Sequence, residues 1–460
     1  MNEQNCWPMF SRREALQIGC SGFFGVSLTT ALAARAAAAA KGKKPIRSVV
    51  LVFLTGGHPQ HEMFDPKPNA PKKVRGEFNH IATTIPGVRF GSLIPQMAKR
   101  ADKMAIVRTM AHRDNRHLSG THNTLTGHIQ PFRGNSNQAK QLNRADWPCY
   151  GGGIALLGAR NNGMPSQVTV HKPLIEGTLV WPGQHAGWLG PKHDPFRLND
   201  DPNRDNFHVS GLSLRGDLNI DRLSSRRSLL KGLNREIDDL DRWAQEQQFT
   251  SRQDIAFSML TSGKLKKALN ISKETKKTRD RYGRHLFGQN MLLARRLVEA
   301  EVPVIQCNMG RVQTWDSHVA HFPRMKSQLP PLDKGVGALI DDLEERNLLD
   351  ETFIVIVGEF GRTPSISPLP KQKLPGRHHW AWGYTATFIG GGVQPGQVIG
   401  KSDRLGGRPT TKAFHPNDLG ATVYSLLGID PHTAIADRFD RPIQLNTGTP
   451  MSELFDGSAV

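Results

Sequence analysis

The chain reads IRSVVLVFLTGG over residues 46–57. Residues 46–55 form a nearly continuous apolar run, and the run ends at a pair of glycines, Gly56 and Gly57. Apolar residues at successive positions are typical of a strand that is buried on both faces, as strands of a parallel sheet are. This stretch therefore predicts the first strand of an α/β protein.

Similar segments follow along the chain. Further strands are predicted at 104–109, 166–170, 302–307, 352–357 and 384–389, and helices at 224–248, 278–301, 326–346 and 417–427. Because strands and helices alternate at both ends of the chain, we expect an α/β fold with a mostly parallel central sheet and helices on both faces. Residues 181–205 are expected to form a long loop on the functional face, and the charged region around 210–280 a helical insertion.

The first 40 residues have the order of parts found in an export signal. Arg12 and Arg13 precede a short apolar run at 18–32, which is followed by small residues up to Ala40. This order predicts a twin-arginine signal peptide at 1–40, recognised by the twin-arginine export machinery, and a working domain at 41–460 that is periplasmic or extracellular. A transmembrane anchor is the alternative, but the apolar run is short and contains several Gly, Ser and Thr residues.

The chain is strongly basic, with a formal net charge of +19. Such a charge would suggest nucleic acid for a cytoplasmic protein, but no nucleic-acid motif is visible and export is expected, so no nucleic-acid partner is predicted. Anionic polysaccharide, or phosphate and sulfate esters, fit the charge better, and a merely solvated basic surface is the alternative. Beyond the signal, only Cys149 and Cys307 remain, too few for a disulfide framework.

Imidazole and carboxylate side chains gather just after the predicted strands. The segments that contain them are GGHPQHEMFDP at 56–66, the histidine-rich 112–128, WDSH at 315–318, GEFGRTP at 358–364 and GRHHW at 376–380. Ligands of an open α/β sheet bind at the carboxyl ends of its strands. Imidazole and carboxylate ligands that converge there suit a divalent metal ion such as zinc, manganese, magnesium or calcium.

A metal of this kind can polarise an ester oxygen or activate a bound water. Arg362 and Arg377, in two of these segments, would then be candidate clamps for a tetrahedral oxyanion. Each segment also has a plain structural explanation, such as a loop hydrogen bond or a surface pair of histidines. The sequence lacks the phosphate-binding loop, the Gly-x-Ser-x-Gly elbow, His-Glu-x-x-His and Cys-x-x-Cys.

Several of these motifs together resemble one known family. The twin-arginine start, FDPKP at 64–68, and the segments at 315–318, 358–364 and 376–380 are similar to the exported, sulfatase-related family catalogued as domain of unknown function fifteen-oh-one. That family is grouped with the alkaline-phosphatase/sulfatase superfamily. The resemblance implies an alkaline-phosphatase-like fold and hydrolysis of phosphate or sulfate esters at a metal site.

The resemblance also implies roles for particular residues. Asp316, His318 and His379 resemble the ligands of one metal site of the superfamily. Glu359 stands where a second site has an Asp, with Glu62 or Asp65 as displaced substitutes for a carboxylate expected directly after the first strand.

Leu125-Thr126-Gly127 resembles the end of the helix that carries the nucleophile in sulfatases. Counting back from Gly127 places His117 at the nucleophile position, with Ser119 and Thr121 as nearby hydroxyls. The sequence departs from the superfamily pattern in three ways. It has no Cys-x-Pro-x-Arg, hence no formylglycine nucleophile; Phe360 replaces a metal-binding histidine; and the carboxylate expected directly after the first strand is missing.

We therefore expect an exported, metal-dependent hydrolase of phosphate or sulfate esters, acting on an anionic ester such as a sulfated or phosphorylated carbohydrate. The alternative is a catalytically degenerate relative that binds anionic envelope carbohydrate or a partner.

Overall fold

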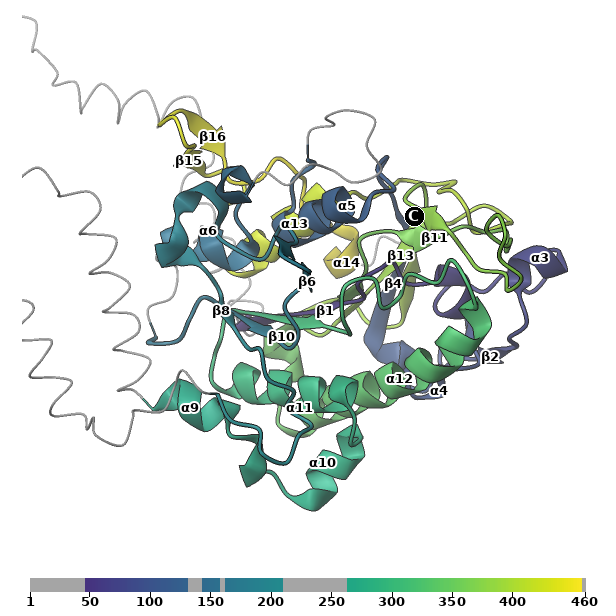
Figure 1. Cartoon of the computed structure of the whole chain (residues 1–460), viewed down its shortest axis with the longest axis horizontal. Helices are drawn as coiled ribbons and strands as arrows, with labels where there is room; N and C mark the ends of the chain where they lie inside the picture. Colours follow the sequence, from purple (N-terminus) through teal and green to yellow (C-terminus); the bar gives the residue numbers. More distant parts are fainter. Residues whose placement is uncertain (1–45, 131–142, 158–161, 210–262, 457–460) are drawn as a thin grey trace, which may run out of the picture.

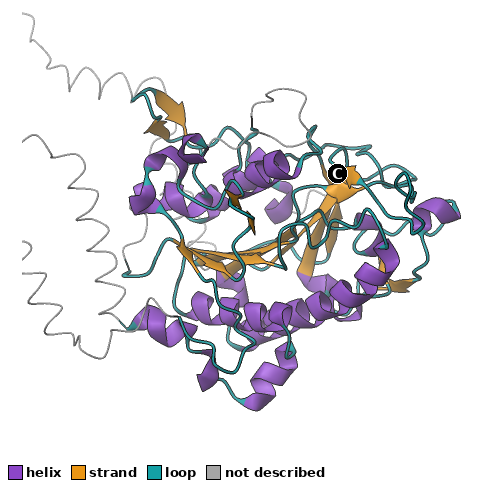
Figure 2. Cartoon of the chain, in the orientation of Figure 1, coloured by secondary structure: helices purple, strands orange, loops and turns teal. Residues whose placement is uncertain are grey.

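A computed structural model of the chain describes residues 46–130, 143–157, 162–209 and 263–456. An eight-stranded sheet lies at the centre, between two layers of helices (Figures 1 and 2). The expected α/β class, with a mostly parallel central sheet and helices on both faces, is confirmed. The predicted signal at 1–40, the helix at 224–248 and most of the insertion around 210–280 lie outside the described residues, so these remain predictions.

The central sheet is built around β1, the strand that the apolar run predicts. In spatial order its strands are β14 (Gln397–Ile399), β4 (Met104–Met110), β13 (Tyr384–Ile389), β10 (Thr352–Val357), β1 (Ser48–Phe53), β9 (Val304–Asn308), β5 (Gln167–Val170) and β8 (Phe196–Arg197). Strand β13 is antiparallel to both of its neighbours, and the other pairings are parallel. The carboxyl ends of β1, β4, β5, β9 and β10 therefore meet at one edge, together with the amino end of β13.

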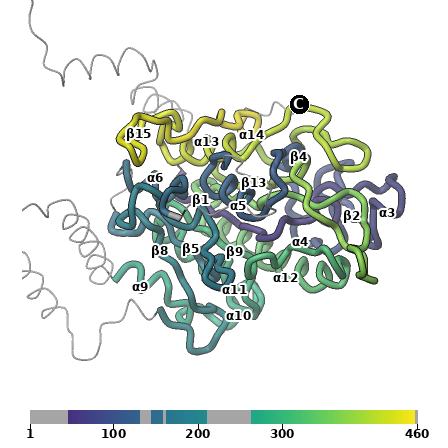
Figure 3. The backbone as a smooth tube through the Cα atoms, turned by 45° about the horizontal axis from the view of Figure 1, so that its top comes forward, coloured from purple at the N-terminus to yellow at the C-terminus, as the bar shows by residue number. Residues whose placement is uncertain are grey.

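Helices cover both faces of this sheet. On one face lie α4 (Pro95–Ala98), α9 (Lys264–Leu269), α10 (Lys276–Tyr282), α11 (Leu286–Glu299) and α12 (His321–Glu345); on the other lie α5 (His117–Thr126), α6 (Tyr150–Leu156), α13 (Pro416–Leu426) and α14 (Glu453–Asp456) (Figures 1 and 3). Alternate residues of a strand point to opposite faces. Accordingly Val50 and Val52 pack into the core beneath α11 and α12, whereas Val49 and Leu51 pack against α6 and α13. Because each face of β1 packs into a separate core, the run at 46–55 is continuously apolar.

The remaining helices and strands are short. They are α3 (Lys72–Arg75) and the two-stranded sheets β2–β3 (His80–Ala82, Arg89–Gly91), β6–β7 (Ile175–Glu176, Leu179–Val180), β11–β12 (Gly361–Arg362, His379–Trp380) and β15–β16 (Ala434–Ala436, Pro442–Gln444). The expected loop at 181–205 contains only the short β8 and two 3-10 turns. In the described part of the chain, no helix has the length and apolar character needed to cross a bilayer.

Two helices differ from their predicted bounds. The helix predicted at 278–301 is two helices, because Gly283 adopts φ 97° and the side chain of His285 caps α11 by accepting a hydrogen bond from the Gly288 amide at 3.0 Å. The helix predicted at 326–346 begins earlier, at His321, and continues through Pro330 and Pro331. Its buried apolar face outweighs the amide hydrogen bonds that the two prolines cannot make.

Candidate metal centre

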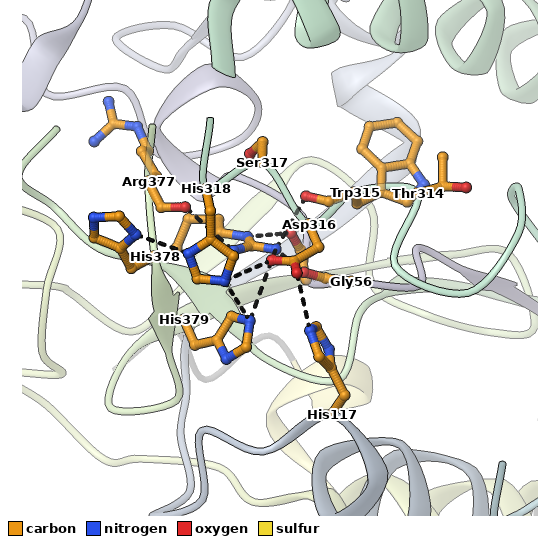
Figure 4. Close-up of polar contacts among 12 residues, drawn as sticks. Gly56, His117, Thr314, Trp315, Asp316, Ser317, His318, Arg377, His378 and His379 are labelled. Carbon is orange, nitrogen blue, oxygen red and sulfur yellow. Dashed lines mark hydrogen bonds and ion pairs between the residues drawn. The ribbon is translucent and has the colours of Figure 1, made fainter. Parts of the chain in front are cut away.

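Four segments at the carboxyl edge of the sheet bring their polar side chains together, and Figure 4 shows those of His117, Asp316 and His379. His117 begins α5 after the loop that follows β4, and Asp316 lies in the turn after β9. Glu359 comes directly after β10, and His379 lies in β12, shortly before β13. The parallel arrangement is the reason for this convergence, since strands far apart in the sequence end at the same edge.

Three of these side chains form a group that could hold a metal ion. His117, Asp316 and His379 each offer one ligand atom, and the three atoms lie within 4.8 Å of one another. Nε2 of His117 is 3.2 Å from Oδ2 of Asp316, and Nε2 of His379 is 3.1 Å from Oδ1. Two imidazoles and a carboxylate form the ligand set of an open, catalytic type of metal site.

His318 lies at the border of this group. Its Nε2 is 3.1 Å from Oδ1 of Asp316 and 2.9 Å from Nε2 of His379. Its other ring nitrogen lies 2.8 Å from Nδ1 of His378, and Nε2 of His378 is 2.9 Å from the hydroxyl of Ser367. His318 is thus held from behind while its Nε2 faces the carboxylate.

The hydrogen bonds of His379 test whether the group suits a cation. Its Nδ1–H donates to the carbonyl of Asn115 at 2.7 Å, so the neutral ring carries a lone pair on Nε2. Burial lowers the pKa of His379, which favours this neutral form. A lone pair that faces a carboxylate oxygen at 3.1 Å is repulsive unless a cation lies between them. The donor set therefore fits a divalent metal ion, with the ring orientation that metal-binding histidines take.

His117 has carboxylates on both sides. Its Nδ1 lies 2.9 Å from Oε1 of Glu359, and its Nε2 faces Asp316. Burial lowers its pKa, but the hydrogen bonds with Asp316 and Glu359 and their negative charges outweigh burial and raise the pKa to about 9. The ring packs between Trp181 and Phe360, at centroid distances of 5.5 and 5.2 Å. Without a metal, the proton on His117 therefore occupies a place where a cation is favoured.

Arg362 supports Asp316 from the protein interior. Burial opposes ionisation of Asp316, but the charge of Arg362 and hydrogen bonds from His117 and His318 hold the pKa of this carboxyl well below its usual range. The guanidinium of Arg362 is fully buried and also donates to the carbonyls of Gly56, Gly57 and Trp315. Because these donors are already engaged, the geometry favours a positioning role over the expected oxyanion clamp.

Glu359 contacts the group through His117 but is not one of its three members. Its carboxylate is fully buried and accepts hydrogen bonds from the amides of Gly56 at 2.7 Å and Gly57 at 3.2 Å, as well as contacting His117. Both glycines have positive φ, and a Cβ at Gly56 would lie 2.5 Å from the amide nitrogen of Asp316. The two glycines thus allow the β1 loop to approach the turn after β9 and to hold Glu359.

The remaining predicted residues lie in other contacts. Glu62 pairs with the buried Arg377 at 2.7 Å and contacts His321 at 3.2 Å. Asp65 pairs with Lys67 at 3.0 Å and with Arg108 at 3.2 Å. Glu62 and Asp65, expected as metal ligands, and Arg377, expected as a clamp, are therefore engaged in ion pairs beside the group.

The predicted hydroxyl and thiol groups are buried. The Thr121 and Ser119 side chains have no exposed surface, and the Ser119 hydroxyl donates to Gln130 at 2.9 Å. Cys149 and Cys307 are free and buried, and burial raises the pKa of both thiols. None of these four groups is presented to a ligand in this conformation, whereas His117 at the start of α5 does face the metal group.

Some supporting residues carry no sign of their role in the sequence. Asn115 orients His379 through a main-chain carbonyl, a contact that no side-chain motif encodes. The sequence indicates His378 only as part of a histidine pair, whereas in the structure it supports His318. The role of Gly56 and Gly57 could be predicted, because a glycine pair at a strand end often marks a close approach of two backbones.

A family model described as "Protein of unknown function (DUF1501)" matches residues 46–455. Among curated proteins, none matches the chain.

Solved structures that are similar include Ps i-CgsB in complex with k-i-k-neocarrahexaose (13% identity, 89% of this chain and 75% of that chain, TM-score 0.42). Another is the PsFucS1 sulfatase from Pseudoalteromonas sp. (12%, 87% and 71%, TM-score 0.39). A third is the alkaline phosphatase from the Antarctic bacterium TAB5 (12%, 84% and 98%, TM-score 0.35).

Proposed function

The chain belongs to the family described as "Protein of unknown function (DUF1501)", and we propose that it is an exported, metal-dependent hydrolase of phosphate or sulfate esters. The observation that carries the proposal is the contact of His379 Nδ1 with the carbonyl of Asn115, which leaves Nε2 of the neutral ring facing the Asp316 carboxylate beside two further imidazoles. His117, Asp316 and His379 would hold the metal, with His318 at its border. When bound, a divalent metal supplies Lewis-acid polarisation of an ester oxygen or a more acidic water.

The other residues of the site orient these ligands. Glu359 fixes the ring of His117, the carbonyl of Asn115 fixes His379, and Arg362 fixes Asp316. Trp181 and Phe360 pack against the ring of His117. Because Ser119 and Thr121 are buried, water rather than a side-chain hydroxyl would act as the nucleophile.

A second candidate function is binding without chemistry. The observation that favours it is the ion pair between Arg362 and Asp316, since a guanidinium already neutralises the carboxylate that would hold the metal. Phe360, which stands where the superfamily pattern has a metal-binding histidine, packs against His379 at a centroid distance of 4.6 Å. A protein of this kind would bind an anionic envelope carbohydrate or a partner through the same face.

The two functions differ in metal content and turnover. The exported protein is purified beside Asp316→Asn, with Asp280→Asn on α10 as the matched control for loss of one carboxylate. Elemental analysis is combined with titration of zinc, manganese, magnesium and calcium, and with hydrolysis of phenyl phosphate and phenyl sulfate. We expect about one metal per chain and turnover in the parent and control, and loss of both in Asp316→Asn. A parent that neither contains nor takes up metal would leave the binding function in place of the hydrolase.

A further inference from the structure

A hairpin with an exposed tip follows β11 and leads back to β12. Its two arms pair at Ser367 and Gly376, where each amide donates to the carbonyl of the other residue at 3.0 Å. Beyond this pair, the amide of Gln372 donates to the carbonyl of Leu369 at 3.0 Å and closes the turn. Every residue at 368–374 is exposed. We call residues 367–376 the 367–376 hairpin.

The base of the 367–376 hairpin is held by buried contacts. Arg377 is completely buried and donates to the carbonyls of Thr363 at 3.1 Å and Val74 at 2.6 Å. The amide of Ile366 donates to the carbonyl of Lys73 at 2.8 Å, so the hairpin begins beside α3, at the edge of the molecule in Figure 1. Three prolines restrict the backbone of the arms: Pro368, Pro370 and Pro375. The tip is thus preorganised, which lowers the entropic cost of binding.

Two leucines lie at this tip with much of their surface in solvent. Leu374 is 55% exposed and Leu369 is 36% exposed. Single exposed apolar residues are ordinary on a protein surface. Here, however, two of them lie beyond the pair of Ser367 and Gly376, on a rigid tip, and neither belongs to a hydrophobic cluster of the described residues. Such a pair indicates an interaction with an apolar partner.

The charged side chains of the hairpin are all cationic. Residues 361–380 contain neither Asp nor Glu, and Lys371 and Lys373 are exposed at the tip. Beside the base, the segment at 71–77 adds three exposed cations and one exposed carboxylate. The partner should therefore carry negative charge next to its apolar region.

We propose that the 367–376 hairpin binds the surface of an anionic lipid bilayer, with its two leucines in the apolar boundary and its two lysines at the headgroup phosphates. Leucine beside lysine is typical of segments that lie in a bilayer interface, and lysines near an anionic membrane are attracted to it. A hydrated polyanion would attract the lysines but would offer the leucines no apolar contact.

This inference goes beyond the hydrolase and does not depend on it, because lipid binding requires neither metal nor turnover. It does determine where the metal group would act. Five residues lead from Leu374 to His379, a span of at most about 18 Å. Binding through the tip would therefore hold the metal group close to the bilayer.

The test measures binding to vesicles that contain no protein, so an acidic protein partner cannot account for it. The exported protein is mixed with vesicles of phosphatidylcholine, with or without about 30% phosphatidylglycerol, and sedimentation gives the partition coefficient. We expect the parent to bind the anionic vesicles about tenfold more tightly than the neutral ones. Leu369→Ser, Leu374→Ser should lower the coefficient for anionic vesicles about tenfold, and Lys371→Gln, Lys373→Gln about fivefold.

Controls remove the same kinds of side chain elsewhere. Phe439→Ser removes a 61% exposed aromatic side chain of the β15–β16 hairpin, and Lys264→Gln, Lys266→Gln removes two exposed lysines of α9. Both elements lie on the opposite side of the molecule from α3 (Figures 1 and 3). Each control should change the coefficient by less than about twofold. Equal losses in hairpin and control variants, unchanged binding of the leucine variant, or no binding of the parent to anionic vesicles would each overturn the proposal.

A second measurement does not depend on loss of binding. Cys149 and Cys307 are buried, so a thiol-reactive, environment-sensitive dye can be attached selectively to Leu374→Cys or, as the control, to Phe439→Cys. Anionic vesicles should increase the fluorescence of the dye at position 374, because it enters the apolar boundary, and leave that at 439 unchanged. No change at 374, or the same change at both positions, would contradict the assignment of the hairpin.

Discussion

Glu359 is a buried carboxylate that contacts the proposed metal group only through His117. It holds His117 through Nδ1 and is itself held by two main-chain amides. A carboxylate behind a metal-binding histidine fixes the ring and raises its basicity. The fully buried charge is tolerated because each of its oxygens accepts hydrogen bonds.

The substitution Glu359→Gln should therefore weaken metal binding without abolishing it. An amide cannot accept hydrogen bonds at both of its terminal atoms, so either His117 or a glycine amide loses its partner. We expect metal affinity to fall about 10- to 100-fold, the usual effect of losing such a supporting group. Competition with a chelator of known affinity measures this change, and Glu345→Gln, at an exposed position of α12, is the control. An unchanged affinity would exclude the supporting role, and a complete loss of metal would point to Glu359 as a direct ligand.

At the scale of elements, the loop after β1 lies very close to the turn after β9, and this close approach shapes the site. Gly56 has φ 113°, and a Cβ there would meet main-chain atoms of Trp315 and Asp316. A contact of 2.5 Å with the backbone cannot be relieved by a side-chain rotation. The approach of the β1 loop to the β9 turn thus requires glycine at this position.

Replacing Gly56 by alanine should both destabilise the fold and disturb the metal group. The positive φ alone costs about 1–3 kcal/mol in a non-glycine residue, and the clash with the Asp316 amide adds to it. The control is Gly87→Ala, which has a similar φ of 78° but open space around its Cβ, so only the backbone strain remains. Free energies of unfolding from urea titration and metal content are measured for both. Equal losses in the two variants would show that the close approach is unimportant.

At the scale of the whole molecule, several histidines are buried in neutral form. Burial lowers the pKa of His58, His122 and His128 to about 4 in the folded protein. In the unfolded chain these rings take up protons near pH 6.5. Because the unfolded state then binds more protons, the stability that these residues contribute is present above pH 6.5 and is lost as the pH falls towards 4.

The free energy of unfolding should accordingly fall between pH 6.5 and 4, by up to about 1.4 kcal/mol per pH unit for each such histidine. Urea unfolding at pH 8, 7, 6 and 5 measures the slope. In His122→Asn, the amide can replace the Nδ1 hydrogen bond to the carbonyl of His128, so we expect a shallower slope with little loss of stability at pH 8. The exposed His432→Asn is the control. A slope that is unchanged in His122→Asn would contradict the assignment.

The proposed export would also concern the entire chain. Replacing Arg12 and Arg13 by lysine should leave the full-length precursor in the cytoplasm, because the paired arginines identify the twin-arginine signal. Cell fractionation and immunoblotting of the precursor and the processed form measure the effect. Normal processing of the lysine form would assign the signal to another pathway. The control is Lys43→Arg, a charge-conserving substitution outside the arginine pair.

Much of the secondary structure follows from local pattern. The strand interiors at 48–53, 104–110 and 352–357 lie where the apolar runs predict them. An apolar run encodes burial, and burial on both faces requires covering layers, so the α/β class follows as well. The break in the helix predicted at 278–301 escaped prediction because it depends on the conformation of Gly283 and a cap by His285, which a periodic pattern does not record.

The sequence by itself determined that imidazoles and carboxylates follow successive strands, and therefore that a polar site lies at the carboxyl edge. Which residues face each other was decided by the tertiary structure. The contact of Gly56 with Glu359 spans 303 positions and that of His117 with Asp316 spans 199. Strand order brings such distant positions together, so no local motif could show that Arg362 is buried behind Asp316, or that His117 joins the metal group while Glu62 pairs with Arg377.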